Sequence, residues 1–229
     1  MYDWSPDMGQ RDGRGVLYMV WGDRCEQELA RSLESARLFG LPTHVVRGDS
    51  NASLVQKSAM YHQSPFAQTL FLDSDTVLLD DPSYGFEMAA RHGLCVVIAP
   101  AGNAAIHWHL DDAPVDLVQY NTGVIFFSKR PPVEQLFETW RRRSDPGQRN
   151  DQPGFALAVH ETGFNPFVLP LMWNYRAAYG QGPIFGPIKI WHSRQPLPDN
   201  IQSYNPQSRG FAKLCRRWWP RRGSFIKSR

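Results

Sequence analysis

Cysteine is scarce in this sequence of 229 residues, which has only Cys25, Cys95 and Cys215. Their number is odd, they lie far apart, and they lack the paired spacing of a zinc finger. This pattern excludes a disulfide framework and a cysteine-based metal site. A reducing compartment suits such a chain best, so we expect a cytoplasmic protein.

Long apolar runs are also missing. No stretch reaches the ~18 apolar residues of a membrane-spanning helix, and residues 1–14 lack the apolar core of a secretion signal, so we expect no export by that route. The composition, 42% hydrophobic and 21% charged, is ordinary for a globular protein. We expect a polar leader over residues 1–14, one domain over 15–205 and a tail over 206–229.

Acidic residues are absent from residues 211–229, which instead hold seven of the 25 basic residues of the chain. The other 18 basic residues are outnumbered by 22 acidic ones, so nucleic acid is not an expected partner. Aromatic residues lie among the basic ones, at Phe211, Trp218, Trp219 and Phe225. This mixture suits peripheral contact with an anionic membrane at its inner face. A solvated, partly disordered tail also explains it and is the favoured interpretation.

Short apolar runs alternate with amphipathic segments through the expected domain. Apolar runs predict strands over 16–21, 43–46, 69–79, 95–99, 122–128 and 188–191. Helical periodicity predicts helices over 29–39, 53–62, 133–143 and 153–160. A strand, a helix and a strand within about 30 residues are typical of a parallel βαβ unit. We therefore expect one α/β domain with a mostly parallel, twisted central sheet flanked by helices.

Two carboxylates interrupt the apolar run at 70–79, whose sequence is Leu-Phe-Leu-Asp-Ser-Asp-Thr-Val-Leu-Leu. On an extended chain, Asp73 and Asp75 point to the same face. Two charges at the end of a buried strand need neutralisation, and Mg²⁺ or Mn²⁺ would provide it. An Asp-x-Asp pair also arises by chance on solvated loops, but the flanking apolar residues favour a metal site.

A second group of metal-ligating residue types lies at His107, His109, Asp111 and Asp112, around Trp108. Alternate histidines share a face on a strand, so a second metal site is one hypothesis. The segment has the character of a loop, however, and a solvated or acceptor-facing loop is the favoured interpretation. In that setting Trp108 would stack on a sugar ring.

Over about residues 15–195 the sequence resembles the GT-A glycosyltransferases, in particular the family 8-like nucleotide-diphospho-sugar transferases. The resemblance rests on motifs in the family's order: Lys-Ser at 57–58, Ser-Pro-Phe at 64–66, Thr-Leu-Phe-Leu-Asp-Ser-Asp-Thr at 69–76, Tyr-Asn-Thr-Gly-Val-Ile-Phe-Phe at 120–127, Asp-Gln at 151–152 and Ile-Trp-His at 190–192. It implies a Rossmann-like GT-A fold and a retaining enzyme. The donor would be a nucleotide-diphosphate sugar, preferably a UDP-sugar, and the acceptor a carbohydrate or glycolipid.

The resemblance implies that Asp73, Asp75 and His192 are the metal ligands, with Ser74 in the donor-binding segment between the carboxylates. Two carboxylates with one imidazole favour Mn²⁺ slightly over Mg²⁺. The cation would act as a Lewis acid on the departing diphosphate. Without the resemblance, His192 is better explained as an ordinary core or surface histidine.

The end of the first strand holds Val20, Trp21, Gly22 and Asp23, which the resemblance makes the nucleoside pocket. Ligands of open α/β sheets bind beyond the carboxyl ends of strands. A simple strand-to-helix turn explains the same four residues. By resemblance, Lys57 would reach the diphosphate as a point charge.

The remaining motifs concern the transferred sugar. Asn121 and Gly123 would leave room for the sugar, and the amide of Asn121 would hydrogen-bond its hydroxyls. By resemblance, Asp151 would bind sugar hydroxyls and Gln152 would lie near the anomeric carbon. A carboxylate at a helix N-terminus explains Asp151 without a sugar, but not Gln152.

One segment departs from the family pattern. A Gly and a Lys-Pro-Trp segment usually follow the family's histidine, whereas Ser-Arg-Gln-Pro-Leu-Pro follows His192 here. Arg194 or Lys189 would supply the missing positive charge.

Two other functions stay open. A sugar-phosphate nucleotidyltransferase needs a Gly-rich basic loop, of which residues 21–24 hold only fragments. A non-catalytic carbohydrate- or membrane-binding protein would tolerate Asp75→Ala.

Overall fold

The computed structural model describes residues 13–49, 53–100, 117–144, 150–176, 186–198 and 201. Most of the expected leader, the segment with His107 and His109, and the tail over 206–229 lie outside the described residues. The membrane contact and the second metal hypothesis therefore stay predictions.

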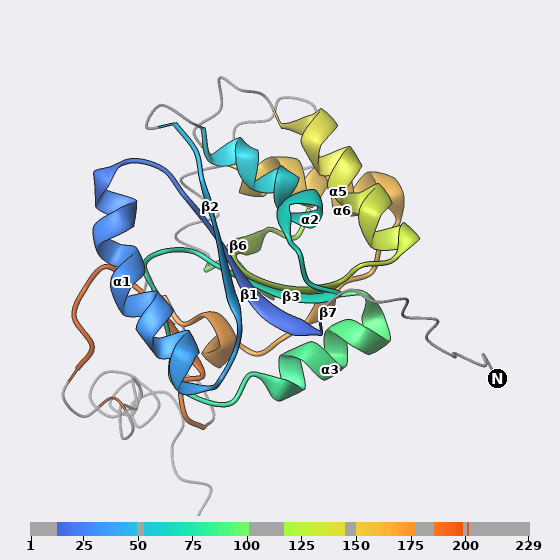
Figure 1. Ribbon diagram of the computed structural model, residues 1–229. Coiled ribbons are helices and arrows are strands. Elements are labelled where there is room, and N and C mark those ends of the chain that lie inside the picture. The colour runs from blue at the N-terminus through green and yellow to red at the C-terminus, as the bar shows by residue number, and fades with distance from the viewer. Residues whose placement is uncertain are drawn as a thin grey trace, which may run out of the picture.

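A six-stranded sheet forms the centre of the fold, in the order β2-β1-β3-β6-β5-β7 (Figure 1). Its strands are β1 Arg14–Val20, β2 Thr43–Arg47, β3 Gln68–Leu72, β5 Leu94–Ile98, β6 Tyr120–Ser128 and β7 Phe167–Val168. Strands β2, β1 and β3 are parallel, and β7 is parallel to β5. Only β6 runs antiparallel to its neighbours, β3 and β5. The expected mostly parallel α/β sheet is confirmed.

Helices cover both faces of this sheet (Figure 1). They are α1 Asp23–Leu38, α2 Met60–Gln63, α3 Ser83–His92, α5 Pro131–Arg143 and α6 Gln152–Thr162, with 3₁₀ helices η1 Leu54–Ala59 and η2 Leu171–Asn174. One core contains buried residues of α1, α3 and η2, and the other contains those of α2, α5 and α6. Because alternate strand residues point to opposite faces, Tyr18 packs in the first core and Leu17 in the second. Among the described residues, no helix is long and apolar enough to cross a bilayer.

The segment expected as one strand over 69–79 is two strands in different sheets. Strand β3 ends at Leu72, and β4 Thr76–Leu78 pairs with β8 Ile190–His192 in a separate two-stranded sheet. The carbonyl oxygen of Asp73 accepts hydrogen bonds from the backbone N–H of Thr76 at 3.2 Å and from its hydroxyl at 2.7 Å. These bonds close a turn over residues 73–76, so the expectation that Asp73 and Asp75 sit on an extended chain is wrong.

Several other elements differ from the sequence-based expectation, among them β7 and η2, which were not predicted. The predicted helix over 53–62 is η1 followed by the single turn α2, and the last predicted strand belongs to the small sheet. Helix α3 was not predicted. It contains Gly85, which is unfavourable in a helix interior, but the ring of Phe126 occupies the space that a side chain there would need. Tertiary packing therefore explains a glycine that the local pattern makes unfavourable.

We expect the core around β3 to account for much of the stability. Leu70 is fully buried, whereas Leu38 at the end of α1 is 81% exposed. Leu70→Ala should lower the free energy of unfolding by about 2–5 kcal/mol, because it leaves a cavity. The matched change Leu38→Ala should stay within about 0.5 kcal/mol. Urea unfolding followed by circular dichroism measures both, and equal effects would contradict this description of the core.

Candidate functional site

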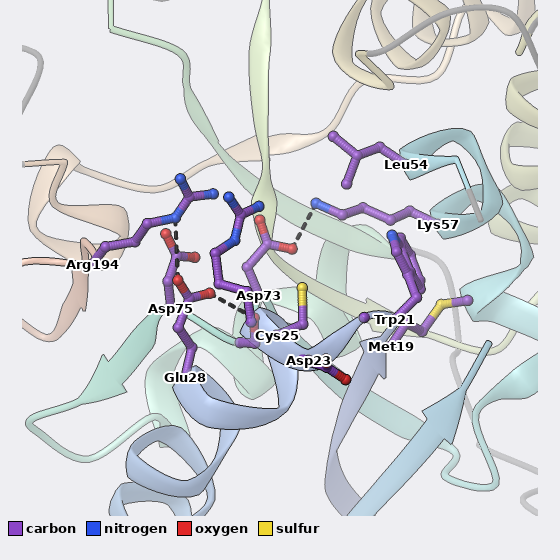
Figure 2. Close-up of a pocket in the computed structure, with 13 residues that line it drawn as sticks. Met19, Trp21, Asp23, Cys25, Glu28, Leu54, Lys57, Asp73, Asp75 and Arg194 are labelled. Atoms are coloured by element: carbon purple, nitrogen blue, oxygen red, sulfur yellow. Dashed lines mark hydrogen bonds and ion pairs between the residues drawn. The ribbon is translucent and has the colours of Figure 1, made fainter. Parts of the chain in front are cut away.

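A cavity of about 430 Å³ opens at the carboxyl ends of β1 and β3. Figure 2 shows Asp73 and Asp75 between Lys57 on one side and Arg194 on the other. Eight residues singled out from the sequence line it: Trp21, Gly22, Asp23, Lys57, Asp73, Ser74, Asp75 and Arg194. The position fits the general rule that ligands of α/β sheets bind beyond the carboxyl ends of strands.

Other residues of the cavity wall carry no signal in the sequence. Met19, Arg24, Cys25, Glu28 and Leu54 also line it. Glu28 Oε2 accepts a hydrogen bond from the Ser74 hydroxyl at 3.3 Å, and Glu28 Oε1 lies 3.2 Å from Arg194 Nε. An acidic residue within an amphipathic helix is ordinarily solvated, so Glu28 was not distinguishable by pattern alone.

Val20 is placed differently from the other predicted nucleoside-site residues. It is 1% exposed and belongs to the core between the sheet and α1. Its neighbour Met19 points to the opposite face of β1 and lines the cavity. The alternation along the strand therefore puts Met19, and not Val20, on the cavity wall.

The three predicted metal ligands converge at one end of the cavity region. One ligand atom each of Asp73, Asp75 and His192 lies within 4.8 Å of the other two. Nε2 of His192 is 3.1 Å from Asp75 Oδ1 and 3.6 Å from Asp73 Oδ2. His192 itself is 2% exposed.

Strand pairing explains why His192 meets the carboxylates. In the antiparallel pair of β4 and β8, Thr76 lies opposite His192. The backbone N–H of Ser193 extends the pairing by donating to the carbonyl oxygen of Asp75 at 3.0 Å. The turn after β3 and the end of β8 are thereby fixed to each other, although they are far apart in the sequence.

Gly123 makes room for this cluster. Antiparallel pairing of β3 with β6 continues to the backbone N–H of Asp73, which donates to the carbonyl oxygen of Gly123 at 2.9 Å. A Cβ atom at Gly123 would lie 2.6 Å from Asp73 Oδ2 and would overlap Cε1 of His192. The glycine predicted to face a sugar therefore lies directly against the ligand cluster.

A buried amide network sets the orientation of His192. Nδ1 of His192 is 2.6 Å from Oδ1 of Asn174, and Nδ2 of Asn174 donates to Oδ1 of Asn121 at 3.0 Å. That same oxygen accepts the backbone N–H of Gly123 at 3.0 Å. With its amide orientated in this way, Oδ1 of Asn174 accepts a hydrogen bond from the Nδ1–H group, which leaves Nε2 as the atom facing the carboxylates. Ligating histidines commonly have such a partner. Asn174 carried no signal in the sequence.

Lys57 is a buried cation beside Asp73. It is 5% exposed, and its Nζ lies 2.6 Å from Asp73 Oδ1 (Figure 2). Burial alone would lower the pKa of Lys57, but the negative charges of Asp151 and Asp73 outweigh burial and raise the pKa above its usual value. The lysine predicted to reach a diphosphate thus also neutralises a carboxylate of the cluster.

Asp151 and Gln152 lie at the start of α6, outside the cavity wall. Asp151 is 3% exposed and accepts a hydrogen bond from the Thr122 hydroxyl at 2.6 Å, and its side chain does not cap the helix. Burial raises the pKa of Asp151, and attraction to Lys57 offsets this only in part. Within the described part of the chain, the buried Oε1 of Gln152 has no hydrogen-bond partner. A ligand hydroxyl would satisfy that acceptor.

Asp75 is strongly biased towards its ionised form. Burial opposes ionisation, but the His192 ring, the Arg176 guanidinium and Lys57 outweigh burial and hold the pKa of Asp75 well below its usual range. The donor set of two carboxylates and one imidazole suits a divalent cation. The space left by Gly123 and the support of His192 by Asn174 are the features expected around such an ion. The residues therefore fit a metal.

Comparison with known proteins identifies the fold. The sequence matches no protein-family model and no curated protein. Among solved structures, the chain is similar to mouse xyloside xylosyltransferase 1 in its apo form, with a TM-score of 0.53 and 15% identity over 82% of this chain and 100% of that one. It is also similar to the glycosyltransferase GlyE of Streptococcus pneumoniae TIGR4, with a TM-score of 0.54 and 13% identity over 90% of this chain. It spans 63% of the GlyE chain. The fold is that of the GT-A glycosyltransferases.

We expect Gly123→Ala to disrupt the ligand cluster, because the added methyl group would push Asp73 away from His192. Affinity for Mn²⁺, measured from the electron paramagnetic resonance signal of the free ion, should fall at least about tenfold, the scale on which disturbed ligand support acts. Gly13→Ala is the matched control, since nothing lies within 4 Å of a Cβ there. Unchanged Mn²⁺ affinity in Gly123→Ala would show that the ion does not bind at this cluster.

The low pKa of Asp75 predicts a loss of stability in acid. A carboxyl with a lowered pKa in the folded state contributes stability that is present above its unfolded pKa, near 3.8, and is lost as the pH falls towards the folded value. Between pH 5 and pH 3 the wild type should therefore lose about 1 kcal/mol more than Asp75→Asn. Urea unfolding at both pH values tests this, with the exposed Asp49→Asn as control. An equal loss in wild type and Asp75→Asn would refute it.

Proposed function

We propose that this chain is a metal-dependent glycosyltransferase that uses a nucleotide-diphosphate sugar, preferably a UDP-sugar, as donor. The supporting observation is the position of Asp73, Asp75 and His192 beside a cavity at the carboxyl edge of a GT-A sheet. We further propose the family 8-like class, transfer with retention, and a carbohydrate or glycolipid acceptor. Mn²⁺ is the favoured cation and Mg²⁺ the alternative.

The cavity offers different surfaces for the two halves of a nucleotide. Trp21 and Leu54 lie on the same side as Lys57 and provide apolar contact area for a base (Figure 2). Asp23, at the first position of α1, is then assigned to the base or the ribose, and Gly22 lets the backbone come close. A volume of about 430 Å³ lies within the range of small-molecule sites, roughly 300–1,000 Å³.

The diphosphate belongs between Lys57 and Arg194, which flank the two carboxylates. When bound, the cation would stabilise, as a Lewis acid, the charge that the diphosphate gains as the sugar leaves. Lys57 and Arg194 add fixed positive charge along the same path. Arg194 thus takes the role of the family lysine that this sequence lacks, because Arg194 lines the cavity, whereas Lys189, paired with Asp80, does not.

The sugar is assigned to the region of Asn121, Asp151 and Gln152. The unfilled Oε1 of Gln152 is a ready acceptor for a sugar hydroxyl, and Asp151 lies close enough to Lys57 to influence its pKa. The side-chain oxygen Oδ1 of Asn121 already accepts two hydrogen bonds within the protein. Asn121 therefore has only its amide N–H groups left for the sugar.

The nucleotidyltransferase alternative is less well supported. Such an enzyme needs a Gly-rich basic loop after its first strand. Here β1 ends at Val20 and α1 begins at Asp23, so only Trp21 and Gly22 separate them. This connection is too short for a loop that wraps a triphosphate.

Thermal unfolding in the presence of nucleotides tests the proposal. UDP, GDP, CDP and ADP are each added with and without Mn²⁺. A ligand at 100 times its Kd should add about 2.7 kcal/mol and raise Tm by roughly 5–10 °C for a chain of this size. We expect this shift with UDP only when Mn²⁺ is present, and we expect Asp75→Ala to abolish it. Release of UDP from UDP-sugars then measures turnover.

Asp80→Ala is the matched control, since Asp80 follows β4 and pairs with Lys189 but does not line the cavity. Asp80→Ala should retain the increase in Tm that UDP causes in the presence of Mn²⁺. If no nucleotide stabilises the wild type, or if Asp75→Ala responds as the wild type does, the proposal fails. A non-catalytic binding protein would then be the better description.

A further inference from the structure

Arg176 is a cation that no sequence motif pointed to, and it touches the ligand cluster. Its Nη1 contacts Nε2 of His192 and lies 3.9 Å from Asp75 Oδ2, and its side chain is 18% exposed. The backbone places it there. Tyr175 forms a parallel bridge with Trp191, and the N–H of His192 donates to the carbonyl oxygen of Tyr175 at 2.9 Å. The segment that carries Arg176 is therefore fixed beside β8.

Arg176 engages the same atoms that a metal ion would take. Because Nδ1 of His192 faces the side-chain oxygen Oδ1 of Asn174, Nε2 is the imidazole atom available as a ligand. That nitrogen now faces a guanidinium donor on Arg176 and an acceptor oxygen on Asp75, 3.1 Å away. One nitrogen cannot satisfy both neighbours, since it either carries a proton or offers a lone pair. An ion that replaced the guanidinium would be bound by the nitrogen and the oxygen together.

The charges of the site also indicate that Arg176 and a metal ion compete for the same atoms. Asp73 is paired with Lys57 at 2.6 Å, and Asp75 has Arg176 beside it at 3.9 Å. Each of the two ligating carboxylates thus has its own protein cation. A divalent ion that entered alone would place two further positive charges next to Lys57 and Arg176, where low solvent exposure weakens screening.

We propose that Arg176 is an internal competitor of the divalent cation at Asp75 and His192. The cation therefore binds weakly by itself. It binds tightly only together with a nucleoside diphosphate, whose negative charge compensates the excess of positive charge around Lys57 and Arg176. This inference rests on the proposed function and concerns the same site. Arg176 acts in it as a positioning residue that sets metal affinity and the coupling between metal and nucleotide.

The test measures Mn²⁺ affinity from the electron paramagnetic resonance signal of the free ion, for the full chain with and without UDP. We expect Arg176→Gln to bind Mn²⁺ alone at least tenfold more tightly than the wild type. With UDP present, the two proteins should differ by less than threefold, so the coupling between Mn²⁺ and UDP falls. Arg176→Lys keeps the charge but loses the planar fork, and it should lie between them.

Two controls keep the outcomes distinct. Arg91→Gln removes one charge at an exposed position on α3, paired with Glu87, and should behave as the wild type does. Thermal unfolding monitored by circular dichroism verifies that each variant is folded. If the wild type binds Mn²⁺ but Arg176→Gln binds it equally or more weakly, the inference is wrong and the proposed function stands. If His192→Ala leaves Mn²⁺ binding unchanged, or no variant binds Mn²⁺ with or without UDP, the metal site itself is refuted and the inference with it.

Discussion

The pairing of β4 with β8 is the contact on which the candidate site depends. It brings His192 opposite Thr76 and beside Asp75, and without it the carboxylates would have no imidazole partner. The small sheet is stabilised by its own cluster of buried residues: Val77, Tyr175, Ile188 and Trp191. Its position against the main domain is fixed by α1, where the Ser32 hydroxyl bonds that of Thr76 at 3.0 Å. A pair of short strands outside the main sheet therefore brings together the residues of the candidate site, which the main sheet supports.

Burying several charged groups in one place is costly unless each has a partner, and here the partners form a connected set. Lys57 pairs with Asp73, and Asp151 is held by Thr122 while Lys57 lies nearby. The neutral amides of Asn121 and Asn174 complete the set by fixing His192. Networks of this kind are rigid when every member is satisfied. Among the described residues, Oε1 of Gln152 is a buried acceptor without a hydrogen-bond partner, and it lies in the region to which we assign the sugar.

The sequence predicted the fold class from apolar runs and helical periodicity, and its motifs, together with the family resemblance, singled out eight residues that line the cavity. It did not predict the turn at 73–76, since apolar residues on both sides of Asp73 and Asp75 look like one strand. The assignment of His192 came only from family resemblance, as a single histidine has no local signature. Asn174 and Arg176 were not predicted, for a different reason. Their positions beside His192 depend on a bridge between Tyr175 and Trp191, which no sequence periodicity predicts.

The segment after His192 departs from the family pattern, yet it is attached to the site by other means. Arg31 on α1 donates to the carbonyl oxygens of Ser193 at 2.8 Å and Gln195 at 3.3 Å, and Glu28 on the same helix pairs with Arg194. Helix α1 thus holds the backbone and side chain of this segment at the cavity mouth. In the proposed enzyme, an arriving diphosphate competes with Glu28 for Arg194, just as the cation competes with Arg176 for Asp75. In the proposed enzyme, donor and metal therefore replace ion pairs that already exist, which favours their binding together.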